Sequence, residues 1–387
     1  MALLYLCAFL MDAATAALLV VRSPLALSLG ASELALGLLG AAGTAPYMVS
    51  CLLFGRASDR YGRRRVLAAG VLALLPVWAL MPACRRVWQF GLLIGLWSFF
   101  LGAFWSPLQA WIGDLRPAGQ VAGGVRGFNL GWSIGVMVGS LIGGSGLFWP
   151  FAFSLGCGLA ILLLVRRVPS PARPPASPSE PSERQRSPVP PLLLLGWVSN
   201  ALAYFTLGSI YSLFPRLAQH LGLSGRLWAS LAFLLGGGRV ISFLIGGARP
   251  AWFYRPASLF LSQGVLLGAL GLLIGGRSAA TFALAFVMVG GAAGFSYFWS
   301  LLHSLEGTAR KGRTTSYHEA ILRTGDFSGS LLAGVVVAQA DSLWAGSRPG
   351  LALRSPYLLT ALLGIGALIW QGGYGYRLSK QGRRPGR

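Results

Sequence analysis

Long uncharged apolar runs constrain this chain more than any other feature of its sequence. Residues 34–54 and 66–84 contain no charged residue, and each run is about as long as a helix that crosses a bilayer, which needs roughly 20 residues. The chain is 55% hydrophobic and only 11% charged, whereas about a quarter of the residues of a soluble domain are charged. These values exclude an ordinary soluble enzyme and predict an integral, multi-pass membrane protein.

Twelve largely apolar runs divide the chain. Because backbone polar groups find no water inside a bilayer, each run is expected to be an α-helix. The fold predicted is therefore an all-α membrane protein with twelve transmembrane helices. The spans are predicted at residues 2–22, 34–54, 66–84, 87–110, 128–148, 149–166, 191–215, 227–247, 256–276, 279–303, 317–340 and 352–372.

The distribution of arginine and lysine predicts the orientation of these spans. If the N-terminus lies in the cytoplasm, the cytoplasmic segments hold 22 basic residues and the exterior segments hold 8. Basic segments are retained on the cytoplasmic side, so both termini are predicted to be cytoplasmic, in a bacterial inner membrane. The net charge of +22 is then a topology signal and an attraction to anionic lipids, and no nucleic-acid partner is expected.

The chain is predicted to consist of two related halves. Phe104-Trp105-Ser106 recurs as Phe298-Trp299-Ser300, at an offset of 194 residues. A segment rich in proline, serine and charge separates the halves, and such a segment cannot pack a core, so it is predicted to be a disordered linker. The predicted boundaries are an N-terminal six-helix bundle at 1–166, a cytoplasmic linker at 167–190, a C-terminal six-helix bundle at 191–376 and a basic cytoplasmic tail at 377–387.

A short basic turn with one acid joins the second and third spans. Residues 55–65 read Gly-x-x-x-Asp-Arg-x-Gly-Arg-Arg-Arg, and this spacing resembles the loop 2–3 signature of the major facilitator superfamily of secondary transporters. The matching residues are Gly55, Asp59, Arg60, Gly62, Arg63 and Arg64. The alternative is a solvated basic loop that only sets the topology.

The resemblance implies more than the helix count. It implies two pseudo-symmetric six-helix bundles with a substrate site near the bilayer midplane between them. It also implies that Asp59 docks near the start of the span at 317–340 and locks the cytoplasmic side in one state. The three arginines of the signature are then expected to pair with loop acids or lipid phosphates.

Three acids lie within predicted spans, and Asp12 is the most central of them. At 1.5 Å per residue it lies about 15 Å along the first helix. An ionised carboxylate at this depth is unfavourable. Asp12 is therefore predicted either to bind a proton that couples to transport or to act as counter-ion for a cationic substrate. The alternative is a structural hydrogen-bonding acid inside the bundle.

The other charged residues within the spans that are candidates for a function are Arg239, Glu319, Arg323 and Asp326. Arg239 follows three glycines and can pair with an acid, bind an anionic group or form a structural ion pair. Residues 319, 323 and 326 share one face of a helix, and Arg323 and Asp326 are predicted to form a pair that breaks and reforms. Ser316 and Glu319 have capping-box spacing, which offers a structural role for Glu319.

The fifth span carries a glycine-rich motif. Gly135, Gly139, Ser140, Gly143 and Gly144 resemble the antiporter motif of the superfamily, except that Ser140 stands where the motif has proline. The alternative is close packing against a neighbouring helix, which small residues allow. The arginine that proton-coupled drug exporters often carry in span 4 is absent.

Polar and aromatic residues mark the helix faces that are predicted to line a cavity. An aromatic lining with few charges suits an amphiphilic or weakly cationic small molecule. The predicted lining residues are Ser98, Trp105, Gln109, Asn200, Tyr204, Tyr211, Ser296, Ser300 and His303.

The function predicted is secondary active transport by alternating access, as a proton-coupled exporter (antiporter) of amphiphilic or drug-like compounds. Two alternatives stay open: a uniporter or proton symporter of a nutrient such as a sugar or organic acid, and a lipid flippase or non-transporting scaffold. The chain lacks His-Glu-x-x-His, Gly-x-Ser-x-Gly and phosphate-binding motifs, so no enzyme activity, cofactor or metal is expected. The expected partners are a small-molecule substrate, protons and membrane lipids, and the chain is expected to be a monomer.

Overall fold

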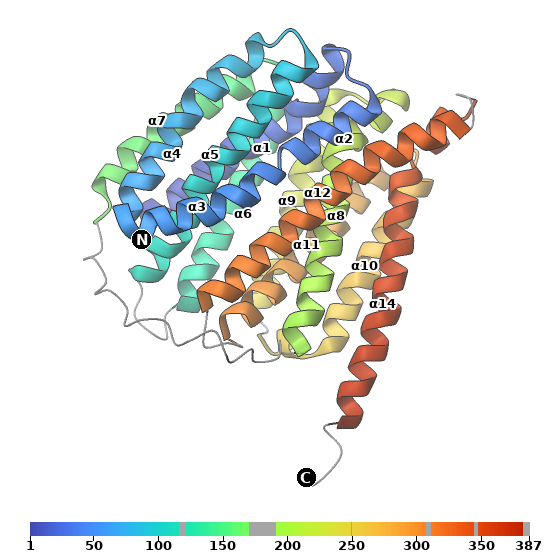
Figure 1. The fold of residues 1–387 in the computed structure, drawn as a ribbon. Coiled ribbons are helices and arrows are strands. Elements are labelled where there is room, and N and C mark those ends of the chain that lie inside the picture. The colour runs from blue at the N-terminus through green and yellow to red at the C-terminus, as the bar shows by residue number, and fades with distance from the viewer. Residues whose placement is uncertain (116–120, 170–190, 249, 307–310, 344–346, 382–387) are drawn as a thin grey trace.

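The computed structural model describes the chain except for residues 116–120, 170–190, 249, 307–310, 344–346 and 382–387 (Figure 1). Further side chains within the described helices, including that of Asp59, are also outside the described part. The described helices are α1 (Ala2–Ser28), α2 (Glu33–Ala42), α3 (Ala45–Tyr61), α4 (Arg63–Leu80), η1 (Met81–Ala83), α5 (Val87–Asp114), α6 (Val121–Gly143), α7 (Trp149–Arg167), α8 (Pro191–His220), α9 (Gly225–Ala248), η2 (Pro250–Tyr254), α10 (Pro256–Gly275), α11 (Ala279–Glu306), α12 (Lys311–Leu343), α13 (Pro349–Ala352) and α14 (Ser355–Gln381).

The predicted all-α membrane fold is confirmed. Within the described residues, eleven helices are long and apolar enough to cross a membrane, and α6 adds a shorter apolar stretch at Gly127–Gly143. Helices α1–α7 form one bundle and α8–α14 form the other (Figure 1). The predicted linker falls mostly outside the described residues. The predicted tail differs in part, because α14 continues as far as Gln381.

The two bundles repeat the same helix packing. In the first, α1 packs along α6, and in the second, α8 packs along α12. A Cβ atom added at Gly135 of α6 would collide with the carbonyl oxygen of Phe9, and one at Gly329 of α12 would collide with that of Phe205. Glycine is required at both places because the backbones touch.

The glycine motif of the fifth span thus has a packing role. A Cβ at Gly139 would collide with the Ala13 carbonyl, one at Gly143 would crowd Val20, and one at Gly144 would collide with Ala229 of α9. Ser140 is buried, and its hydroxyl has no hydrogen-bond partner among the described residues. These contacts support the packing interpretation of the motif.

The Gly135→Ala variant is expected to be less stable than the wild type by about 1–3 kcal/mol, because an added methyl group forces two packed backbones apart. The matched control is Gly156→Ala on α7, where a Cβ would meet nothing within 4 Å. Thermal unfolding in detergent measures both variants. A Gly135→Ala protein that melts with the wild type and the control would contradict this account of the contact.

The second predicted span, residues 34–54, is confirmed by a candidate membrane span at Glu33–Ser58. Its helix is not continuous, however, because it is broken between α2 and α3 at Gly43 and Thr44. Pro46 lacks an N–H group, and its ring excludes the carbonyl one turn earlier, so the helix cannot continue through it. The Ser98 hydroxyl donates to the freed Gly43 carbonyl oxygen at 2.7 Å, as a broken membrane helix requires.

The basic turn predicted at 55–65 is also shorter than expected. Helix α3 continues to Tyr61, and α4 begins at Arg63. The chain reverses at Gly62 alone, whose φ angle is 95°. This left-handed conformation is favourable only for glycine, which gives that signature residue a backbone role.

Candidate functional site

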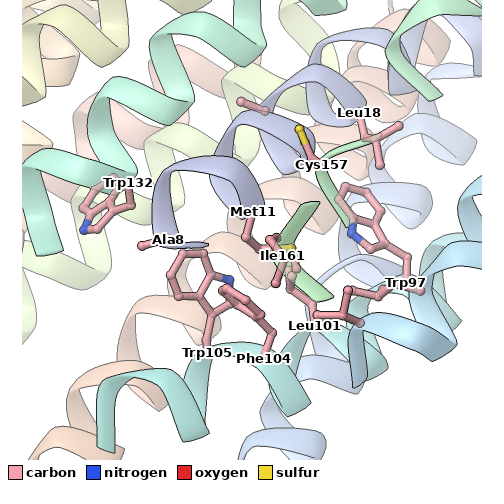
Figure 2. Close-up of a cluster of buried hydrophobic side chains, with 14 of the residues drawn as sticks. Ala8, Met11, Leu18, Trp97, Leu101, Phe104, Trp105, Trp132, Cys157 and Ile161 are labelled. Atoms are coloured by element: carbon pink, nitrogen blue, oxygen red, sulfur yellow. The ribbon is translucent and has the colours of Figure 1, made fainter. Parts of the chain in front are cut away.

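A cavity of about 170 Å³ lies between the two bundles. Its walls come from α1, α2, α3, α5 and α6 of the first bundle and from α8, α9, α11 and α12 of the second. Trp97, Leu101 and Trp105 of α5 form an apolar wall, with Trp132 of α6 on a neighbouring side (Figure 2). The broken second span contributes Gly40 and Gly43.

All five charged residues singled out within the spans line this cavity: Asp12, Arg239, Glu319, Arg323 and Asp326. A sixth charge, Arg22, lines it as well and was missed. Arg22 is the last residue of the first predicted span, 2–22, and it was counted among the eight basic residues of the exterior segments. However, α1 continues through Pro24 to Ser28, so Arg22 lies inside the helix and is only 5% exposed.

Arg323 is held by an aromatic ring and one acid. Its guanidinium carbon lies 4.2 Å from the centroid of the Tyr47 ring. The predicted pair with Asp326 is present, with 3.7 Å between Nη1 of Arg323 and Oδ2 of Asp326. This distance is longer than a hydrogen bond, so the two groups form an ion pair without a direct hydrogen bond.

Arg239 contacts aromatic rings from both bundles. Its guanidinium carbon lies 5.7 Å from the centroid of the Trp132 ring and 5.9 Å from that of Tyr204. Such cation–π contacts stabilise a buried guanidinium. Within the described residues no acid lies within ion-pair distance of Arg239.

The cavity acids differ in their surroundings. Glu319 interacts with the Gln109 side chain and with Arg323. By contrast, Asp12 has no hydrogen bond or ion pair among the described residues, and Arg239 and Arg323 act on it only at longer range. The capping-box role predicted for Glu319 was wrong, because α12 begins at Lys311 and Ser316 therefore lies inside the helix.

Five of the predicted lining residues face the cavity: Ser98, Trp105, Gln109, Tyr204 and Tyr211. The other four do not. Asn200 and Ser296 are buried in the packing, the Ser300 hydroxyl contacts Nδ1 of His318 at 2.6 Å, and Nε2 of His303 donates to the Phe253 carbonyl oxygen at 2.8 Å. Burial between packed helices, and the contacts of Ser300 and His303 with other residues, account for their absence from the lining.

Five aromatic lining residues were missed: Tyr47, Trp97, Phe128, Trp132 and Tyr297. Each lies within an apolar run, and nothing in the sequence distinguishes it from an aromatic residue that faces lipid. Trp132 and Tyr297 contact each other edge to face across the two bundles, with centroids 5.7 Å apart. The site is therefore more aromatic than predicted.

The two bundles meet tightly at the end of the molecule that is predicted to face the exterior. The Ser23 hydroxyl donates to the Tyr211 carbonyl oxygen at 3.0 Å, and Arg216 forms a 2.8 Å ion pair with Glu33. Closer in, Gly37 of α2 faces Gly334 of α12, and a Cβ at Gly37 would lie 2.8 Å from the Cα of Gly334. We call these six residues the seal.

The loop signature lies at the opposite end. Arg63 forms an ion pair with Asp114 at the end of α5, with 3.2 Å between Nε and Oδ2, and it donates to the Ser58 hydroxyl. Arg64 donates to the Val168 carbonyl oxygen. The side chain of Asp59 lies outside the described residues, so its docking near the start of α12 stays a prediction.

Two helical bundles around a charged central cavity, sealed at one end, define a membrane transporter. The family model of the Major Facilitator Superfamily matches residues 4–329. The chain therefore belongs to this superfamily, and it is a transporter rather than an enzyme. Among curated protein sequences, none matches the chain.

Solved structures share this fold. A bacterial homolog of the human lysosomal transporter Spinster, in an inward-facing and occupied conformation, has a TM-score of 0.75 at 16% identity, over 99% of this chain and 98% of that one. The human organic anion transporter MFSD10 has a TM-score of 0.65 at 18% identity, over 94% and 98%. A D-xylose–proton symporter has a TM-score of 0.66 at 15% identity, over 94% and 95%.

Proposed function

We propose that this chain is a proton-coupled transporter of amphiphilic small molecules and that Asp12 carries the proton. The observation that supports this most is the lack of any ion pair or hydrogen bond to Asp12 among the described residues, although Asp12 lines the central cavity. An unpaired carboxylate inside a membrane protein is unfavourable, and binding a proton removes its charge. Asp326 and Glu319 have closer partners, so Asp12 is the acid best placed to exchange a proton with the cavity.

The cavity walls support an amphiphilic substrate. Tryptophan and leucine side chains of α5 form one side, and charged groups from α1, α9 and α12 form the others. Ligand sites of this composition bind an apolar body and orient it through a few polar groups. The similar structures are described as transporters of organic anions and of xylose, and at their low identity they do not select a substrate for this chain.

The seal supports alternating access. It closes the cavity at the predicted exterior end, so we infer that the structure represents an inward-facing or occluded state. Opening requires the two bundles to separate there and to close at the end that carries the loop signature. We propose that Asp59 acts in that closure, with both termini in the cytoplasm of a bacterial cell and the chain working as a monomer.

The direction of coupling depends on the charge of the substrate. Export by proton antiport, the direction expected from the sequence, requires a substrate that competes with the proton for Asp12. Symport is the second candidate, and the three arginines in the cavity favour it.

Transport into proteoliposomes tests the proposed function. Purified protein is reconstituted, a pH gradient is imposed, and the movement of anionic, neutral and cationic naphthalene derivatives is followed. We expect the pH gradient to drive at least one of these probes against its own concentration gradient. If all three move at the same rate with and without the gradient, proton coupling is wrong.

A further inference from the structure

We infer that the substrate is an organic anion whose acidic group is held by Arg239 and Arg323, and that one proton accompanies it through the cavity. This inference rests on the proposed function and adds a substrate class and a direction of coupling to it. The ligand chemistry is a carboxylate, phosphate or sulfonate group attached to an apolar body.

The two guanidinium groups keep their hydrogen-bond donors available. A guanidinium group has five N–H donors, and buried donors are almost always used. No hydrogen bond from the side chain of Arg239 or Arg323 to another described residue is found, and Nε of Arg323 is buried without a partner. Donors that the protein leaves unused are available to a ligand.

Aromatic rings hold both guanidinium groups in place without using these donors. Arg323 lies over Tyr47, and Arg239 lies over Trp132. A ring face attracts the charge of a nearby guanidinium group, and this attraction does not depend on a hydrogen bond from its N–H groups. A planar edge of two N–H groups matches two oxygens of a carboxylate, phosphate or sulfonate.

Arg239 and Arg323 line the same part of the molecule, the central cavity. Asp12 of α1 and Tyr204 of α8 line this cavity as well, and the guanidinium carbon of Arg239 lies 5.9 Å from the centroid of the Tyr204 ring. A cation in this cavity would be repelled by both guanidinium groups, so the position of Asp12 does not favour a cationic substrate. An anion would be attracted by both of them.

Charge balance in the cavity indicates symport. The described lining holds three arginines, Arg22, Arg239 and Arg323, and three acids, Asp12, Glu319 and Asp326. When all six groups are ionised, the lining has no net charge. A bound anion then gives the loaded cavity one excess negative charge, and the low-dielectric interior of a membrane protein solvates this charge poorly. A proton on Asp12 restores neutrality, and the loaded cavity then crosses the membrane without net charge.

The first test uses the wild-type protein in detergent. Isothermal titration compares 2-naphthalenesulfonate, a permanent anion, with the neutral 2-naphthalenesulfonamide and with a 2-naphthylmethyl trimethylammonium cation. Because charge-assisted hydrogen bonds are stronger than neutral ones, we expect the sulfonate to bind about 10- to 100-fold more tightly than the sulfonamide. Tighter binding of the cation or of the neutral compound would overturn the inference.

The second test uses Arg239→Gln and Arg323→Gln. We expect each to lower the affinity for the sulfonate by about 10- to 100-fold and to leave sulfonamide binding unchanged. That retained binding shows that the cavity is still folded. Arg239→Lys should lie between the wild type and Arg239→Gln, because lysine keeps the charge but loses the paired donors. The matched control is Arg226→Gln, at an exposed site, and equal sulfonate affinity in all four variants would overturn the inference.

The third test separates this inference from the proposed function. A sulfonate cannot carry its own proton, so its uptake into proteoliposomes should remove one proton from the outer medium per anion. If the pH gradient drives only the cation or the neutral probe, the anion inference fails while proton coupling stands. If the gradient drives no probe, the proposed function itself fails.

Discussion

Asp12→Asn is expected to abolish proton-driven accumulation of 2-naphthalenesulfonate without abolishing its binding. Asparagine has nearly the shape of a protonated aspartate, so the cavity of this variant is always in its proton-loaded charge state. With one proton per anion, a gradient of about two pH units can sustain about a 100-fold accumulation in the wild type. The variant should only equilibrate the probe across the membrane.

Two measurements and a control variant separate the possible causes. Accumulation under a pH gradient should be lost, whereas exchange of labelled for unlabelled sulfonate at equal pH should continue, because exchange needs no release of the proton. Asp341→Asn is the matched control, because Asp341 is an exposed acid near the end of α12 and its loss should change neither rate. Normal accumulation by Asp12→Asn would remove Asp12 from the coupling mechanism.

Gly334→Val is expected to hold the seal open and to stop transport. Gly334 of α12 faces Gly37 of α2, and a Cβ at position 334 would lie 2.9 Å from the Cα of Gly37. No rotamer change relieves this contact, because both sides of it are backbone. The two bundles must therefore stay apart at this end, and the state in which the cavity faces the opposite end becomes inaccessible.

Cysteine labelling measures whether the seal is open or closed. Ser212→Cys places a thiol at a residue of α8 that is fully buried in the sealed structure. The reporter is introduced after the four natural cysteines have been replaced by alanine: Cys7, Cys51, Cys84 and Cys157. A membrane-impermeant thiol reagent should label the reporter slowly in the parent protein and rapidly once Gly334→Val is added.

The control for this experiment is Gly271→Val on α10, where a Cβ meets nothing within 4 Å. It should leave both transport and labelling at the parent level. If Gly334→Val transports at the parent rate, the glycine contact is not part of the seal that must open and close.

The sequence by itself determined the class of fold. Membrane spans are visible because each must be apolar over its whole length, and the signature at 55–65 places the chain in its superfamily. The central charges were also visible, since an acid or arginine inside an apolar run is conspicuous. Three charges identified in this way, Asp12, Arg239 and Arg323, do line the cavity.

The tertiary structure alone decided which groups these charges meet. The hydropathy pattern locates a span, and the position of a residue within the span gives its depth in the membrane. Neither shows which neighbouring helix the side chain faces. The placing of Arg239 over Trp132 joins α9 to α6, and that of Arg323 over Tyr47 joins α12 to α3. Arg22 was counted with the exterior residues because the first span was predicted to end there, whereas α1 continues past Pro24 to Ser28, and no local rule predicts that. Contacts between two bundles depend on how the bundles dock, and a single chain of residue types carries no direct record of that docking.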